Sequence, residues 1–298
     1  MPDTSPDFSS ITAICVDTLN HDLALAACAR MAGLGFAELV LVTDDAIEPH
    51  VHAGEAPAGL RIERIARLKG RRAYSEFVLT DLVRHVHTPH ALVFQWDGFV
   101  VDPSLWRPEF LDFDYVGGLF PPDGRWGGNR RVGNGGFSLR STRLMEAVAQ
   151  AAPLDTGIAE DWVICRVMGD ALEKDGFTFA PAALAKHFSV DMMSVPEFRL
   201  QEPALVADRT FGFHGFCNFH LVFTDDEIFE LADTRPNGFR NELLTSQPAA
   251  ALMVNLASTG RMQAAQELGR RAARIFGMDL KTASLQDVVA RCDGRHVA

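Results

Sequence analysis

The N-terminal part of the chain alternates strand-like and helix-like patterns. Ser10 to Val16 is an apolar run typical of a buried strand, and Glu38 to Val42 is a second one. Between them, His21 to Leu34 has apolar residues at helical spacing, and Gly33 and Gly35 end that pattern. A strand, a helix and a strand in this order predict parallel strands with helices on the faces of the sheet. We therefore expect an α/β fold.

Later segments continue this alternation. Ala46 to Gly59, rich in Ala, Gly, His and Pro, is expected to be a loop, and Tyr74 to Val86 a helix. Ala91 to Phe94 has the pattern of a short strand, and Phe137 to Ala152 that of a strand followed by an amphipathic helix. From about Asn241 the Ala, Leu and Arg pattern predicts two or three helices.

Length and composition limit the class of protein. At 298 residues one catalytic domain with a small appendage is expected, and we divide the chain into residues 1–240 and a helical appendage at 241–298 that packs or forms a homo-oligomer. A net charge of −11 excludes sequence-independent binding of nucleic acid, which relies on Lys and Arg. Scattered cysteines indicate reduced thiols in a cytoplasm. No apolar run could span a bilayer, so a membrane-linked acceptor would be reached by peripheral contact.

An acidic residue follows the predicted strand at Ala91 to Phe94, in the order Gln95, Trp96, Asp97 and Gly98. Ligands of open α/β sheets bind at the carboxyl ends of the strands. A carboxylate there can hold Mn²⁺ or Mg²⁺ and bridge to a diphosphate. Asp-Gly is also ordinary turn chemistry, so a simple turn is the alternative.

Gly117 to Gly136 contains eight glycines in twenty residues, which indicates a functional loop. Its end, from Gly133 to Arg140, does not match the dinucleotide fingerprint, because Ser138 stands where a Gly or Ala is needed. Backbone without Cβ atoms lets a sugar ring lie against the main chain, with Asn134 offering amide contacts. A bare glycine turn is the alternative.

Two further groups have the right chemistry for a site. Glu160 and Asp161 begin a predicted helix, where they either cap it or accept the proton of an attacking hydroxyl. His187 and His214 are flanked by aromatic residues and are either core histidines or ligands for Mn²⁺.

The chain has one basic concentration, which is either a solvated face or a source of one cation for a diphosphate. It consists of Arg61, Arg64, Arg67, Lys69, Arg71 and Arg72, and Tyr74 follows it.

Taken in order, several segments between Ile11 and Phe216 resemble a bacterial domain-of-unknown-function family that is regarded as glycosyltransferase-like. They are YSEFVLTDL, ALVFQWDGFVVD, EFLDFDYVGG, RVGNGGFSLRS, EDWVICR, HFSVD and FGFHGF. More distantly, the set resembles the GT-A glycosyltransferases. That resemblance implies a GT-A-like, Rossmann-like mixed sheet flanked by helices.

The resemblance also implies roles for single residues. Asp97 matches the second acid of a metal-binding D-x-D, and Gln95 replaces the first, so that a neutral amide stands in place of one anionic ligand. Gly135 to Ser138 match a segment that shapes the sugar pocket, Glu160 and Asp161 match an acidic pair at the acceptor site, and His214 matches a late His that completes the metal shell.

We therefore predict a glycosyltransferase that moves a sugar from a nucleotide-diphosphate sugar, such as a UDP-sugar, to a hydroxyl of a glycan, glycolipid or other saccharide. The expected metal ligands are Asp97 and His214, and the catalytic carboxylate is Asp161 or Glu160. The residues expected to contact the nucleotide sugar are Asp17, Thr18, Lys69, Tyr74, Gln95, Asn134, Gly135 and Gly136. The alternatives are an inactive carbohydrate-binding or nucleotide-sugar-binding module and a metal-dependent hydrolase.

Overall fold

The computed structural model describes residues 6–120, 132–151, 157–191, 210–235 and 237–294. The chain divides into two compact units, of which the first is Met1–Val190 with Arg209–His214 and the second is Asp191–Asp208 with Gly215–Ala298. Each unit buries apolar residues of its own. The domain boundary expected between residues 240 and 241 stays a prediction.

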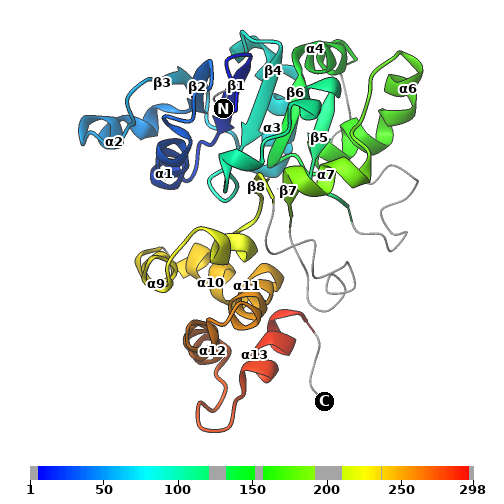
Figure 1. Cartoon of the computed structure of the whole chain (residues 1–298). Helices are drawn as coiled ribbons and strands as arrows, with labels where there is room; N and C mark the ends of the chain where they lie inside the picture. Colours follow the sequence, from blue (N-terminus) through cyan, green and yellow to red (C-terminus); the bar gives the residue numbers. More distant parts are fainter. Residues whose placement is uncertain (1–5, 121–131, 152–156, 192–209, 236, 295–298) are drawn as a thin grey trace, which may run out of the picture. The chain divides into compact units, whose positions relative to one another are not determined.

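The first unit is built on a six-stranded sheet in the order β3-β2-β1-β4-β6-β5 (Figure 1). The strands are β1 Ile11–Val16, β2 Glu38–Thr43, β3 Leu60–Arg64, β4 His90–Phe94, β5 Tyr115–Gly117 and β6 Phe137–Ser141. Strands β3, β2, β1 and β4 are parallel, whereas β6 runs antiparallel to both β4 and β5. A mixed α/β sheet flanked by helices, as expected from the sequence, is confirmed.

Short helices and one further strand pair complete this unit. The helices are α1 His21–Met31, α2 Glu48–His52, α3 Gly70–Thr80, α4 Thr142–Gln150, α5 Glu160–Trp162, a π-helical turn at Val163–Val167, α6 Gly169–Lys174 and α7 Ala182–Phe188. Single 3₁₀ turns lie at Asp45–Ile47, Leu82–His85, Pro103–Leu105 and Pro108–Asp112. Strands β7 Ser189–Val190 and β8 Gly212–Phe213 pair in parallel.

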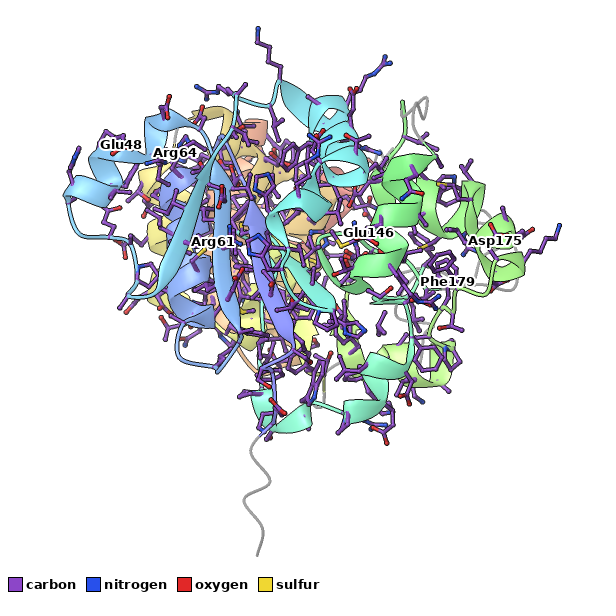
Figure 2. All side chains as sticks on the ribbon, turned by 90° about the horizontal axis from the view of Figure 1, so that it is seen from above. Glu48, Arg61, Arg64, Glu146, Asp175 and Phe179 are labelled. Carbon is purple, nitrogen blue, oxygen red and sulfur yellow. The ribbon has the colours of Figure 1, made fainter. Side chains whose placement is uncertain are left out.

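The expected loop at Ala46 to Gly59 was wrong, because α2 lies within it, and β3 was not expected at all. Strand β3 lies at the edge of the sheet and keeps charged residues along its length (Figure 2). Arg61 donates to Glu38 over 2.7 Å and also pairs with Glu63, and Arg64 pairs with Glu48. An edge strand stabilised by such pairs has no continuous apolar run to reveal it in the sequence.

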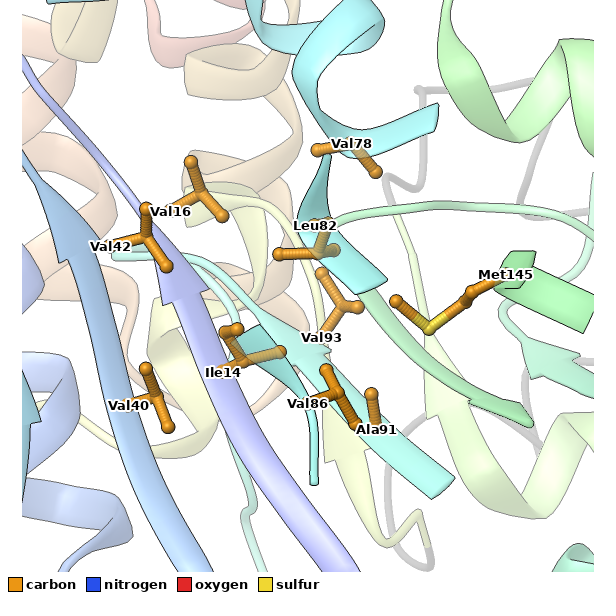
Figure 3. Close-up of a cluster of buried hydrophobic side chains, with 10 residues drawn as sticks. All are labelled: Ile14, Val16, Val40, Val42, Val78, Leu82, Val86, Ala91, Val93 and Met145. Carbon is orange, nitrogen blue, oxygen red and sulfur yellow. The ribbon is translucent and has the colours of Figure 1, made fainter. Parts of the chain in front are cut away.

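A hydrophobic cluster joins the sheet to the helices that cover one of its faces (Figure 3). Its members are Ile14, Val16, Val40, Val42, Val78, Leu82, Val86, Ala91, Val93 and Met145. The strand residues alternate along β1, β2 and β4, because every second side chain of a strand points to the same face. Each large side chain buried here stabilises the fold by about 1.5–3 kcal/mol relative to exposure. This core supports the strand ends at which the candidate site lies.

The second unit is helical. It contains a 3₁₀ segment at Phe216–Leu221 and the helices α9 Asp225–Thr234, α10 Asn237–Thr245, α11 Gln247–Ser258, α12 Met262–Phe276 and α13 Leu285–Cys292. Helix α11 packs against α10, α12 and α13. The described part of the stretch for which two or three helices were expected thus holds four, and α10 begins before Asn241. No helix in the described ranges is long and apolar enough to cross a membrane.

Candidate functional site

A cavity of about 180 Å³ opens at the carboxyl ends of β1 and β4, beside the N-terminus of α3. Asp17, Thr18, Tyr74 and Gln95, all expected to contact a nucleotide sugar, line it together. Lys69 stands between two lining residues, and its side chain is exposed. The topology therefore gathers, at one end of the sheet, residues that lie far apart in the sequence.

Hydrogen bonds to the main chain hold the walls of this cavity. Asp17 Oδ1 accepts from the backbone N–H groups of Leu19 and Asn20, each over 2.7 Å, and so shapes the turn into α1. Thr18 Oγ1 accepts from Leu68 N over 3.0 Å, which ties the loop after β1 to the loop before α3. These two side chains build the cavity walls.

The basic concentration divides in the folded chain. Arg61 and Arg64 pair with acids at the edge of the sheet. Arg71 is exposed and lines the cavity. Only part of the basic segment therefore lies where it can meet a ligand.

Asp97 lies in a tight turn after β4. Gln95 N donates to Gly98 O over 3.2 Å, and Gly98 N donates to Gln95 O over 3.1 Å. A Cβ atom on Gly98 would come within 2.8 Å of Phe213 O, so only glycine fits this turn. The turn brings Asp97 Oδ1 to 3.7 Å from Nε2 of His214, which follows β8. The Asp-Gly turn is thus present, and the same turn places Asp97 beside His214.

Four hydrogen bonds connect the glycine segment before β6 to the cavity. Gly136 N donates to Asn134 Oδ1 over 2.9 Å, and Asn134 Nδ2 lies 3.1 Å from His214 Nδ1. His214 Nε2 lies 3.1 Å from Gln95 Oε1, and Gln95 Nε2 donates to Tyr74 Oη over 2.7 Å. Residues predicted to bind the metal, the sugar and the nucleotide are therefore joined by direct hydrogen bonds.

The backbone of the glycine segment is tightly constrained. Asn134 has a φ of 60°, a left-handed conformation that Asn tolerates better than most residues. Its carbonyl oxygen accepts from Tyr115 Oη over 3.1 Å. A Cβ atom would lie 1.7 Å from Glu160 Oε1 if placed on Gly135, and 2.1 Å from His214 Nε2 if placed on Gly136. Glycine is therefore needed at both positions, so that Glu160 and His214 can pack directly against the backbone. The central part of the glycine-rich loop, 121–131, lies outside the described residues.

Glu160 and Asp161 lie in different surroundings. Glu160 is buried, and its Oε1 is 3.5 Å from an Arg140 nitrogen. Asp161 is half-buried, and its Oδ2 accepts from Gly135 N over 3.2 Å. Adjacent residues thus contact the same glycine segment from a buried and from a more accessible position.

Sequence reasoning missed Arg140, the buried residue that holds this segment. Arg140 Nε donates to Ser138 Oγ over 3.0 Å, and its Nη2 donates to Gly135 O over 3.3 Å. Burial is the largest single influence and opposes its charge, but the surrounding acidic groups, Tyr115 and Glu160 first among them, together raise the pKa of Arg140 above the ordinary value. An Arg inside the strand predicted to begin at Phe137 is the one signal that could have revealed it, because a charge buried within a sheet must be paired.

The residues present fit a metal only in part. Asp97 offers a carboxylate, which suits a hard cation such as Mn²⁺ or Mg²⁺. His214 Nε2 is already engaged with Gln95 Oε1. No group of three or more His, Cys, Asp or Glu side chains in the described part of the chain is placed to hold a metal ion. A metal here would need substrate oxygens to complete its shell.

Comparison with known proteins identifies one family. Residues 60–214 match the family model described as "Protein of unknown function (DUF5672)". No curated protein matches the chain significantly.

Solved structures with a similar fold share little sequence. The mannosyltransferase PcManGT from Pyrobaculum calidifontis, in complex with GDP-Man and Mn²⁺, has a TM-score of 0.41 at 14% identity and covers 98% of this chain and 89% of its own. 4-Diphosphocytidyl-2C-methyl-D-erythritol synthase from Anaerococcus prevotii has a TM-score of 0.38 at 8% identity, with 54% and 82% covered. HddC from Yersinia pseudotuberculosis has a TM-score of 0.36 at 11% identity, with 57% and 88% covered. Such TM-scores are too low to carry a functional inference.

Proposed function

Since this chain belongs to the DUF5672 family of proteins of unknown function, we propose its function from the geometry of its own site: transfer of a sugar from a nucleoside-diphosphate sugar to a hydroxyl acceptor. One observation carries the proposal. The cavity lined by Asp17, Thr18, Tyr74 and Gln95 is linked through Gln95 to His214, beside Asp97. In this proposal the cavity binds the nucleotide, Asp97 binds the cation, and the neighbouring glycine segment contacts the sugar.

The cavity takes part of the donor. Its volume of about 180 Å³ is below the roughly 300–1,000 Å³ typical of pockets for whole ligands, so it suits a nucleoside. Gln95 donates to Tyr74 Oη, which leaves the hydroxyl hydrogen of Tyr74 to donate to an oxygen of the ligand. Burial raises the pKa of Tyr74, so the hydroxyl keeps this hydrogen. Lys69 and Arg71, both exposed at the start of α3, supply positive charge for the diphosphate.

Asp97 is the residue that would hold a divalent cation, Mn²⁺ or Mg²⁺, together with diphosphate oxygens. Such a cation offsets the charge that develops on the departing nucleoside diphosphate. His214 was expected to join it as a second ligand. Its hydrogen bonds favour a different role.

The acceptor hydroxyl belongs near Asp161, whose half-buried carboxylate already contacts Gly135 N. We assign Asp161 the role of orienting or deprotonating this hydroxyl. Glu160 is the second candidate, but its buried contact with Arg140 suits it better to holding the glycine segment. A cytoplasmic reaction on a glycan, a glycolipid or another saccharide is part of the same proposal.

Calorimetry with UDP and GDP, in Mn²⁺ and in EDTA, tests donor binding. Mn²⁺ should increase the affinity for the nucleoside diphosphate, and Asp97→Asn should remove this gain. Asp102→Asn is the matched control, because Asp102 caps a 3₁₀ turn by accepting from the backbone N–H and the hydroxyl of Ser104. Equal affinities in Mn²⁺ and EDTA would refute the metal, and release of no nucleoside diphosphate from any sugar donor would refute transfer.

Binding without transfer is the second candidate function. It is favoured by Gln95, an amide where the GT-A pattern has an acid, and by the lack of a three-ligand cluster in the described ranges. A protein of this kind would bind a nucleotide sugar and release no product with any acceptor. Free sugar formed without an acceptor would instead indicate a hydrolase.

A further inference from the structure

His214 is at the centre of the hydrogen bonds that join the glycine segment to the cavity, and a backbone group sets their direction. Gly136 N–H can only donate, so the atom of Asn134 that faces it must be the oxygen. The Asn134 amide nitrogen therefore faces His214 Nδ1, at 3.1 Å. Because that nitrogen carries two hydrogens, Nδ1 must be the acceptor and carry none.

The other ring nitrogen then carries the hydrogen. His214 Nε2 faces Gln95 Oε1 at 3.1 Å and Asp97 Oδ1 at 3.7 Å. A lone pair there would face two oxygen atoms, whereas an N–H is attracted to both. Two independent sets of contacts, one on each ring nitrogen, thus select the same tautomer.

We propose that His214 is a positioning residue held as the Nε2–H tautomer, and that it is not a metal ligand. Its N–H orients Gln95 and Asp97, and Asn134 keeps it in that state. This role rests on the proposed function, because it takes the ligand beside Gln95 and Asp97 to be a nucleotide sugar. It also explains Gln95, since an amide both accepts from His214 and donates to Tyr74, which a carboxylate cannot do.

Asn134→Asp is the decisive variant, because it replaces the hydrogen-bond donor that faces His214 Nδ1 with an acceptor. One carboxylate oxygen still accepts from Gly136 N–H, and the other faces His214 Nδ1 and needs a hydrogen there. Asp tolerates the left-handed backbone of this position about as well as Asn. With the hydrogen on Nδ1, the Nε2 lone pair becomes available to a metal. Gln150→Glu, at the exposed end of α4, is the matched control that adds the same charge outside the cavity and its hydrogen bonds.

The experiment is ¹⁵N NMR of histidine-labelled, full-length protein, with His214→Gln used to assign the signals. Wild type and Gln150→Glu should show the hydrogen on Nε2, and Asn134→Asp should show it on Nδ1. Zn²⁺ is the probe, because it is diamagnetic and binds imidazole nitrogen. Asn134→Asp should bind it at Nε2 about 10–100-fold more tightly than wild type, the range over which a carboxylate partner tunes a metal-bound His.

Two results would overturn the proposal: a hydrogen on Nδ1 in the wild type, or Zn²⁺ bound at wild-type Nε2 as tightly as in Asn134→Asp. The wild-type spectrum decides the matter alone if the variant does not fold. None of these readouts needs sugar transfer, so failure of the proposed function and failure of this inference are separate outcomes.

Discussion

Exchange of Glu160 for Gln should strongly destabilise the first unit. The charges of Arg140 and Glu160 lie 3.5 Å apart, and their side chains are only 1% and 7% exposed. At an effective dielectric constant of about 20, their attraction is roughly 5 kcal/mol. Arg140 cannot lose its proton, so the variant leaves a buried charge without its partner, which typically costs about 3–5 kcal/mol. We expect the lower part of this range, because Arg140 keeps its bonds to Ser138 and Gly135.

A double variant tests whether the unpaired charge causes this loss. Arg140→Met combined with Glu160→Gln removes both charges, so it should be more stable than Glu160→Gln alone. Glu146→Gln is the control for the same chemical change on an exposed surface of α4, and it should stay within about 0.5 kcal/mol of wild type.

Tryptophan fluorescence during urea unfolding is a suitable assay, because it reports on the first unit. All four tryptophans precede Val190 in the sequence, and three of them, Trp96, Trp106 and Trp162, lie in the described part of that unit. A loss below about 1 kcal/mol in Glu160→Gln would show that Arg140 does not depend on Glu160, as would a double variant whose loss equals the sum of the two single losses.

Three other predictions follow from single residues. Asp161→Asn should lower turnover by about a hundredfold to ten-thousandfold with little change in nucleotide affinity, and turnover within a few-fold of wild type would leave Asp161 a purely structural role. Gly136→Ala should lower the thermal midpoint of unfolding, since its Cβ would lie 2.1 Å from His214 Nε2. Gly157→Ala is the control, because a Cβ there has no neighbouring atom within 4 Å, and equal midpoints for the two variants would contradict the close packing at Gly136. Burial lowers the pKa of His220 to about 4. Since the unfolded state binds this proton near pH 6.5, the second unit should lose roughly 3 kcal/mol between about pH 6.5 and pH 4, and circular dichroism should find a flatter pH dependence in His220→Gln.

Local pattern was enough to predict the elements that hold the sheet together. Strands β1, β2 and β4 and helix α1 occur where apolar periodicity indicates them, because each buries a face along its own length. Strand β3 escaped this reasoning, since it is an edge strand whose Arg61 and Glu63 are satisfied by ion pairs. Burial of apolar side chains leaves a periodic trace in the sequence, and pairing of charges between elements does not.

In the candidate site, too, some features could be predicted from local sequence and others depend on folding. Local sequence was enough to predict which residue types flank the strands, such as Asp97 after β4 and the glycines before β6, because they are neighbours of the strands along the chain. Folding is what buries Glu160 against Arg140 while Asp161 stays half-buried, and what brings Gln95 to His214, 119 residues away. The direction of a hydrogen bond and the burial of a charge depend on partners brought together by folding, and no local spacing encodes them.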